Sequence, residues 1–327
     1  MNKKIYMKVG FPEINDVSGR FTIADLYPDK SNRTGIYLLS FPEGDYYIGQ
    51  TVDIVRRFSE HLKSKGAISG LAFYPCSANI LDDEERRCVS SLQYKCKLRN
   101  IELVTYPQIE TNLETLIGNK EQEEWLLTDF SVEKNNKFRI CETLRTAQRV
   151  KYSKRFQKLY GISSFLKCGI PVMQKYMRYC ICEPVTTEMA FWSCSCLPPY
   201  NRQILIFSRL NLRSSEVFTL GYDRMIKKPF YSFHISKSRL FANSKAYLQK
   251  LQEKYLTFYI TDHAYSSAGD DQCNIHFYDF EEVMDALDNQ VIHRAIKFFN
   301  LGQMRRGATM YRDSHCVDLA DCILKRD

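Results

Sequence analysis

The sequence has no long hydrophobic run: its 327 residues contain no uninterrupted apolar stretch of about 18 residues or more, the length that a membrane-spanning helix needs. Its first six residues lack the apolar stretch of about 7 to 15 residues that a secretory signal requires. Internal repeats and low-complexity tracts are missing as well. We therefore expect an intracellular protein with no membrane partner. In a prokaryote or a virus its compartment would be the cytoplasm.

Cysteine is too dilute for a disulfide-stapled protein. Twelve cysteines are spread over the whole chain, whereas small secreted domains concentrate them. Without an export signal, we expect a reducing compartment and thiols that are free or bound to metal. The contents of 44% hydrophobic and 26% charged residues exclude wholesale disorder, and the length suggests about two domains. The sequence leaves the oligomeric state open.

Acidic residues are scarce in one part of the chain. Between Arg145 and Arg213 there are 12 Lys or Arg residues and only two acids, Glu183 and Glu188, so this segment carries +10 while the whole chain carries +8. Such a segment is typical of a nucleic-acid contact, although a solvated basic face would give the same count. The predicted DNA-binding residues are Lys151, Lys154, Arg155, Lys158, Lys167, Lys175 and Arg178.

The pattern of hydrophobic and turn residues divides the chain into four segments. Residues 1–33 are predicted to be an N-terminal extension and residues 34–140 an α+β domain. Residues 141–202 form the basic segment, and residues 203–327 a second mixed α/β domain of unknown role. In that last segment, strand-like runs lie at 204–207, 257–260 and 275–277, and a helix is predicted at about 280–300.

The α+β segment begins with two β-rich runs, residues 34–39 and 46–50, which the turn residues between them predict to form a hairpin. Asp53 is a good N-cap for a helix that runs to about Lys65. The rest of the segment predicts further elements in the order helix, strand, helix, at about 82–98, 101–106 and 112–130. The predicted order is therefore β-β-α-α-β-α.

Side chains suited to phosphodiester cleavage gather in these elements. Tyr37 and Tyr47 lie on the two strands, and Arg57 and His61 share one face of the following helix because they are four residues apart. Carboxylates follow on the third predicted helix, at Glu121, Glu123 and Glu124. A carboxylate can hold a divalent metal, an arginine can neutralise a phosphate, and a phenol or imidazole can handle a proton. Packing tyrosines and a solvated Arg/His pair would give the same pattern.

Two tripeptides make the pattern more specific. Gly35-Ile36-Tyr37 is followed ten residues later by Tyr47-Ile48-Gly49, and Arg57 and His61 stand at matching offsets on the next helix. Together these residues closely resemble the GIY-YIG nuclease family. The resemblance covers about residues 34–140, and the chain after residue 140 resembles no family that we identify.

The resemblance implies a small α+β domain whose three-stranded antiparallel sheet carries the active site. It also implies hydrolysis of DNA with one divalent metal, Mg²⁺ or Mn²⁺. Tyr37 would act as general base or orient the attacking water, Tyr47 would position water or phosphate, and Arg57 would stabilise charge on the phosphate. His61 would be a second proton-handling group, while the two glycines would be structural.

The same resemblance implies a metal-binding glutamate on the third helix and an asparagine somewhat more than ten residues later. Glu123, three residues before Leu126-Leu127, fits the glutamate best, with Glu124 as the alternative. Asn135 or Asn136 could supply the asparagine, but neither has the family's usual surroundings.

Two further motifs lie in the basic segment. The pairs Cys180/Cys182 and Cys194/Cys196 flank a predicted hairpin, where four thiols could bind zinc, although paired cysteines are often only small buried residues. The run from residue 163 to 177 looks somewhat like a helix-turn-helix with Gly169 at its turn; two packed helices are the alternative.

From these patterns we predict a metal-dependent DNA endonuclease, site-specific and of restriction or homing type. A structure-specific repair nuclease and an inactive DNA-binding protein that kept the fold are the alternatives.

Overall fold

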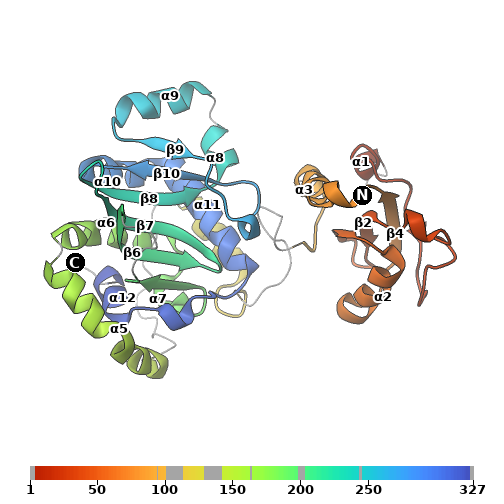
Figure 1. Cartoon of the computed structure of the whole chain (residues 1–327), viewed down its shortest axis with the longest axis horizontal. Coiled ribbons are helices and arrows are strands. Elements are labelled where there is room, and N and C mark those ends of the chain that lie inside the picture. The colour runs from red at the N-terminus through yellow and green to blue at the C-terminus, as the bar shows by residue number, and fades with distance from the viewer. Residues whose placement is uncertain are drawn as a thin grey trace. The chain divides into compact units, whose positions relative to one another are not determined.

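Antiparallel strands form two separate sheets, one in each of two compact units of the protein (Figure 1). The computed structural model describes residues 4–93, 95–100, 113–128, 142–162, 164–197, 203–242 and 245–324. The first unit comprises Met1–Ile109 and the second Glu110–Asp327. Within the described ranges, no helix is long and apolar enough to cross a bilayer.

The sheet of the first unit has the strand order β1-β4-β2-β3. Its strands are β1 (Asn15–Asp16), β2 (Gly35–Ser40), β3 (Tyr46–Thr51) and β4 (Gly70–Pro75). The predicted hairpin is confirmed, since β2 pairs with β3 and Tyr37 lies opposite Gly49. The strand predicted at 101–106 lies outside the described residues. The sequence analysis missed β4, because its first four residues are all buried and so show no alternation between polar and apolar positions.

Helices cover both faces of this sheet. They are α1 (Lys4–Met7), α2 (Ile54–Lys65) and α3 (Leu81–Leu92). The predicted N-cap is confirmed, because the Asp53 carboxylate accepts the N–H groups of Val55 and Arg56. Alternate residues of β2 enter two different cores: Ile36 packs with residues of α1 and α3, while Tyr37 packs with residues of α2.

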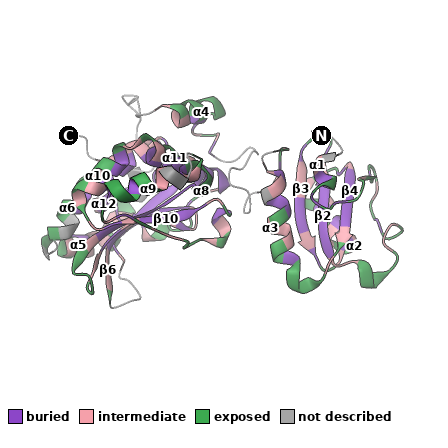
Figure 2. Cartoon of the chain, turned by 90° about the horizontal axis from the view of Figure 1, so that it is seen from above, coloured by how far each residue is buried: buried purple, intermediate pink, exposed green. Residues whose placement is uncertain are grey.

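The predicted N-terminal extension is part of this first unit. Tyr6, Val9 and Phe11 belong to the core beneath α3, and Val17 and Ile23 belong to the core beneath α2. The two-residue strand β1 adds to the free edge of β4. Figure 2 shows the resulting buried sheet between helices with exposed outer faces. Residues 4–33 therefore complete the hydrophobic core around the motif strands.

The second unit is built on a six-stranded sheet with the order β5-β6-β7-β8-β10-β9. Its strands are β5 (Trp192–Ser195), β6 (Ile204–Leu212), β7 (Ser215–Asp223), β8 (Lys228–Ile235), β9 (Tyr259–Thr261) and β10 (Cys273–Phe277). Its helices are α4 (Asn119–Leu127), α5 (Glu142–Ile162), α6 (Ser164–Cys180), α7 (Pro184–Thr187), α8 (Lys237–Phe241), α9 (Lys245–Lys254), α10 (Phe280–Asp288), α11 (Gln290–Arg306) and α12 (Val317–Leu324). The antiparallel sheets and surrounding helices confirm the predicted mixed α and β fold class.

The basic segment and the C-terminal segment share this one sheet. Strand β5, which belongs to residues 141–202, pairs with β6, which begins the segment 203–327. Helices α5 and α6 both contact α12. The single predicted helix at 280–300 is two helices, because Asn289 ends α10 and its side chain caps the first turn of α11.

The predicted helix-turn-helix is wrong. Helix α6 continues from Ser164 to Cys180 without a turn at Gly169. A Cβ atom at Gly169 would lie 2.2 Å from Cδ2 of Leu220 on β7, so the glycine allows helix and sheet to approach closely. Pro171 lies inside the helix and does not open a second one. The sequence analysis placed Gly169 at a turn, whereas it lies inside a helix and is required by close packing.

Candidate active site

The two glycines of the motif allow close packing around β2. A Cβ atom at Gly49 would lie 2.3 Å from the Tyr37 hydroxyl oxygen, so only glycine lets the tyrosine ring cross β3 at this position. A Cβ atom at Gly35 would lie 2.2 Å from the carbonyl oxygen of Tyr74 on β4. Both residues are therefore required by close packing, which aims the Tyr37 hydroxyl past β3.

The Tyr37 hydroxyl contacts the imidazole of His61. The distance from Tyr37 Oη to His61 Nε2 is 2.6 Å, and the two residues are 1% and 7% exposed. The Arg57 side chain also hydrogen-bonds to Tyr37. The Tyr47 ring centroid lies 5.2 Å from that of His61 and 6.2 Å from that of Tyr37. The structure thus brings four predicted site residues together at the β2–β3 hairpin and α2.

Burial sets the protonation states of this cluster. Loss of solvent raises the pKa of the Tyr37 phenol well above its usual value, with a smaller opposing effect from Arg57. Burial, together with the positive charges of Lys65 and Arg57, lowers the pKa of His61 to about 4. At neutral pH the phenol is therefore protonated and the imidazole neutral. In the tautomer of His61 that carries its proton on Nδ1, Tyr37 donates its hydrogen bond to His61 Nε2.

Lys65 is a member of the site that the sequence analysis missed. Its Nζ atom lies 4.0 Å from the centroid of the Tyr47 ring, and burial lowers its pKa, as do the charges of Arg99 and Arg57. Lys65 follows His61 by four residues on α2, so helical spacing could have indicated it. With the Arg57 side chain, which is 44% exposed and 3.1 Å from Glu60, it gives one face of α2 two cations.

A carboxylate from α3 shares the electrostatic environment of the cluster. Burial raises the pKa of half-buried Glu85, and so does the nearby charge of Asp82, while a hydrogen bond from Gln50 and the charge of Arg57 oppose the shift. Glu85 in turn raises the pKa of Tyr37. Gln50 also donates to Asp82 at 2.5 Å. The sequence analysis assigned no function to these acidic residues.

Glu123 belongs to the second unit. It is exposed on α4, which belongs to the second unit and packs against α11. Lys297 of α11 donates to the Thr128 carbonyl at 2.8 Å, and Arg305 donates to Gln122 at 2.7 Å. The alternative Glu124 is also exposed on α4, 3.8 Å from Lys120. Tyr37 and Glu123 therefore belong to two different compact units.

An asparagine supports the motif strand from outside the sheet. The Asn100 amide donates to the carbonyl of Ile48 at 2.8 Å, and its oxygen accepts the N–H of Ile48 at 3.0 Å. Asn100 is 5% exposed and satisfies the backbone groups of Ile48 next to the bridge that Leu98 forms with Tyr46. The predicted candidates, Asn135 and Asn136, lie outside the described residues. Nothing in the sequence pattern around residue 100 indicated this role.

The predicted zinc site of Cys180, Cys182, Cys194 and Cys196 is not formed. Among the described residues, no group of three or more His, Cys, Asp or Glu side chains is placed to hold a metal ion. The expected hairpin is also wrong, because Cys180 ends helix α6 and Cys182 lies in the bend between α6 and α7. Cys194 lies on β5, and Cys196 directly follows that strand. All four thiols are buried, so the alternative of small buried residues describes them correctly.

Part of the predicted basic segment has partners within the second unit. Arg145 contacts Glu188 and Asp321, and Lys175 contacts Asp288 at 2.5 Å. Arg155 donates to the Cys196 carbonyl at 2.5 Å. Lys154, Lys158 and Lys167 are exposed, as is Lys151, although Lys151 also donates to the Asp313 carbonyl. Arg178 is half-buried on α6.

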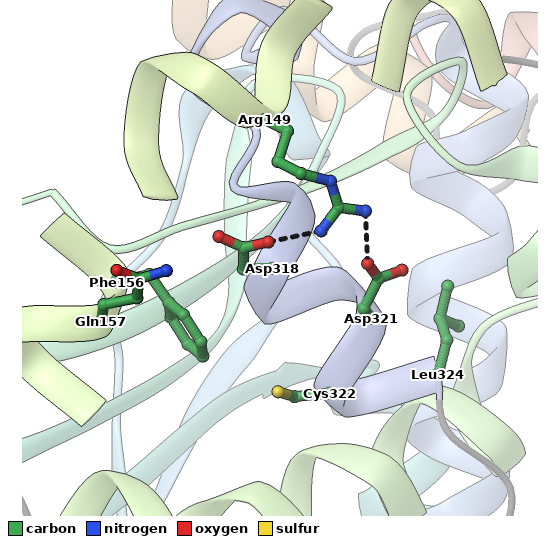
Figure 3. A pocket seen from close by; sticks show the side chains of 7 residues that line it. All are labelled: Arg149, Phe156, Gln157, Asp318, Asp321, Cys322 and Leu324. Carbon is green, nitrogen blue, oxygen red and sulfur yellow. Dashed lines mark hydrogen bonds and ion pairs between the residues drawn. The ribbon is translucent and has the colours of Figure 1, made fainter. Parts of the chain in front are cut away.

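A cavity of 550 Å³ lies between α5 and α12 of this unit. Figure 3 shows the Arg149 guanidinium in it, held by Asp318 at 2.5 Å and Asp321 at 2.7 Å. Phe156 and Leu324 contribute apolar walls. Two carboxylates already neutralise the one cation, so the cavity offers no unpaired charge to a phosphate.

Comparison with known proteins identifies the first unit. Residues 33–102, about a fifth of the chain, match the family model of the GIY-YIG catalytic domain, so the predicted resemblance is confirmed. No curated protein and no solved structure matches the chain. The first unit is thus similar to the catalytic domain of a nuclease family. Glu85 and Asn100 lie inside the matched residues, and Glu123 lies outside them.

The lowered pKa of His61 predicts a pH-dependent stability. Because the folded protein holds this pKa near 4 and the unfolded chain near 6.5, the unfolded chain binds the extra proton between these values. The free energy of unfolding is therefore expected to fall on acidification from pH 7 to 5, by about 2 kcal/mol from His61 alone. Urea unfolding followed by circular dichroism, with His61→Gln beside the wild type, measures this contribution. An equal pH dependence of both proteins would contradict it.

Proposed function

We propose that the protein is a metal-dependent endonuclease that hydrolyses phosphodiester bonds of DNA. The observation that carries this proposal is the buried contact between Tyr37 and His61, beside Arg57 and Glu85, within a GIY-YIG catalytic domain. A phenol, an imidazole, a guanidinium and a carboxylate supply every group that such a hydrolysis requires.

Tyr37 and His61 would move the proton of the attacking water. The buried phenol holds its own proton too tightly to be an anion, so it can accept a proton only while it gives one away. His61 is neutral at physiological pH and lies in contact with that hydroxyl through Nε2. We infer a relay in which Tyr37 takes the water proton as it donates its own to His61.

Arg57 and Lys65 would bind the phosphate. Arg57 hydrogen-bonds to Tyr37 and is partly exposed, so its guanidinium can reach a substrate next to the attacking group. Its positive charge would stabilise the charge that develops on the phosphate during attack. Lys65, packed over Tyr47, adds a second positive charge on the same face of α2.

Glu85, in place of Glu123, is the residue that we propose to hold the metal. The oxygen donors of Glu85 and of the neighbouring Asp82 suit a hard cation such as Mg²⁺ or Mn²⁺, which commonly uses one or two carboxylates and completes its shell with water and phosphate oxygens. Bound there, the cation would supply positive charge to the phosphate and leaving oxygen. Gln50, which hydrogen-bonds to both acids, would orient them.

The second unit would hold the DNA and choose the cleavage site, as in restriction or homing nucleases. The exposed lysines of α5 and α6, Lys151, Lys154, Lys158 and Lys167, are suited to phosphate contacts. Arg145, Lys175 and Arg155 are less suited, because their charges or donors already have partners within the protein.

Incubation with supercoiled plasmid tests the proposal. We expect nicking or linearisation with Mg²⁺ or Mn²⁺, none with EDTA, and a loss of at least about 10²-fold in Arg57→Ala. Genomic and phage DNA belong in the same series, because a specific enzyme cleaves only where its site occurs. Salt-dependent binding without cleavage of any of these DNAs would contradict the proposal and indicate an inactive DNA-binding protein.

A further inference from the structure

The tip of the β7–β8 hairpin exposes two apolar side chains side by side. Strand β7 ends at Asp223, which pairs with Lys228 at the start of β8, so residues 224–227 form the turn. Met225 is 74% exposed and Ile226 is 49% exposed. The hairpin side chains Leu220 and Phe230, by contrast, are buried in the second unit. The two apolar residues therefore project from the end of the sheet and do not contribute to its core.

The turn is held in one conformation. The Asp223 carboxylate accepts the N–H groups of Met225 at 2.8 Å and of Ile226 at 3.1 Å, and its other oxygen accepts from the Tyr278 hydroxyl at 3.4 Å. The N–H of Arg224 donates to the carbonyl of Gln203 at 3.0 Å. The tip is therefore anchored to β6 and to the end of β10 before any partner binds, which lowers the entropy cost of binding.

Positive charges enclose the apolar pair. Arg224 precedes it, Lys227 and Lys228 follow it, and all three are exposed. Lys227 has a φ of 59°, a left-handed conformation that is unfavourable for a residue with a side chain and that glycine would adopt freely. The chain thus places a cation here at an energetic cost. The only acidic residue of the turn, Asp223, has its oxygens bonded to the turn itself and to Tyr278.

The exposed lysine of α6 lies at the same end of the unit. Gly169 is packed against Leu220, three residues before Asp223 on β7, which is a distance of about 10 Å along a strand. Lys167 comes two residues before Gly169, with its Nζ 5.3 Å from the Tyr160 ring centroid. The part of α6 that carries Lys167 therefore packs against the strand that leads to the hairpin tip.

We propose that this hairpin tip inserts Met225 and Ile226 into the minor groove of duplex DNA while Arg224, Lys227 and Lys228 bind the phosphates on either side. Apolar wedges between flanking cations are the means by which proteins unstack a base step and bend a duplex. The inference rests on the proposed function, since it takes DNA as the partner. It adds that the second unit bends the duplex.

Binding and bending of DNA by the full-length protein test this proposal in an Arg57→Ala background. The substrates are random-sequence duplexes of about 40 base pairs, labelled at both ends for energy transfer. We expect Met225→Ser/Ile226→Ser to raise the Kd about tenfold and to abolish the increase in energy transfer on binding, with an unchanged salt dependence. Lys227→Gln/Lys228→Gln should reduce the slope of log Kd against log salt by about two. Leu256→Ser and Lys250→Gln, at exposed positions outside the hairpin, are the matched controls.

The outcomes separate this inference from the proposed function. Wild-type affinity and bending in the serine variant would overturn the wedge while leaving DNA binding intact. Absence of DNA binding in every protein, the Arg57 wild type included, would overturn both proposals. Loss of binding to vesicles of phosphatidylcholine and phosphatidylserine in the serine variant, with DNA binding unchanged, would overturn the inference in favour of a membrane contact.

Discussion

Glu85→Gln is expected to reduce DNA cleavage by at least about 10²-fold, whereas Glu123→Gln is expected to cleave as the wild type does. The reason is location. Within the first unit, Glu85 raises the pKa of Tyr37, and the charge of Arg57 lowers the pKa of Glu85. Glu123 is exposed on a helix of the second unit. Glutamine keeps the size of the side chain and removes the anionic charge that a divalent cation needs. Initial cleavage rates over a range of Mg²⁺ concentrations give the measurement.

Two observations would show that a loss of cleavage in Glu85→Gln does not result from misfolding. Glu85→Gln should bind DNA as tightly as the wild type and keep its circular dichroism spectrum, because the Gln50 amide can still hydrogen-bond to the new side chain. Glu84→Gln is a control on the same helix, since Glu84 contacts Arg87 at 2.7 Å and Tyr74 at 2.8 Å. Full activity in Glu85→Gln together with inactivity in Glu123→Gln would show that the original prediction was correct and that α4 supplies the metal ligand.

Arg145→Met is expected to lower the free energy of unfolding of the second unit by about 3–5 kcal/mol. Arg145 is 2% exposed and lies 3.1 Å from Glu188, whose carboxylate also contacts His315 at 3.1 Å. Methionine fills similar space but leaves a buried carboxylate without its main counter-charge. For a unit of this size we expect the Tm to fall by about 10 °C.

Tryptophan fluorescence measures this effect in the second unit alone, because both tryptophans of the chain, Trp125 and Trp192, belong to it. Lys154→Met changes an exposed residue of the same helix and should alter stability by less than about 0.5 kcal/mol. The same two variants also test whether Arg145 of the basic segment binds DNA. Weaker DNA binding by Arg145→Met without a change in Tm would mean that Arg145 faces DNA and not Glu188.

The motif region could be predicted because its signals are local. The turn between the motif strands, the Asp53 cap and the spacing of Arg57 and His61 act within a few residues, and the structure has the hairpin and helix in those places. The two glycines were part of the motif that the sequence showed, but the reason for glycine at these positions depends on strand pairing. A Cβ atom at Gly49 would clash with Tyr37 on the neighbouring strand.

The position of β4 and the approach of Glu85 to Tyr37 could not be predicted in this way. Strand β4 is buried at both faces near its start, so it lacks the period of two that identifies a strand. The metal-binding glutamate was predicted from a spacing counted along the chain, and Glu85, which we propose for that role, approaches Tyr37 and Arg57 by the packing of α3. Asn100 likewise reaches Ile48 across 52 residues of sequence.

The sequence by itself determined the catalytic family, the hairpin and helix that carry Tyr37 and His61, and the positions of the charged residues. Only the tertiary structure decided which of these charges are available for a substrate. Arg145 and Lys175 have carboxylate partners more than 40 residues away, whereas the tip at Arg224 and Lys227 is exposed. The energy of an ion pair depends on the distance between the two charges. For residues far apart in the sequence, this distance is set by the folding of the chain.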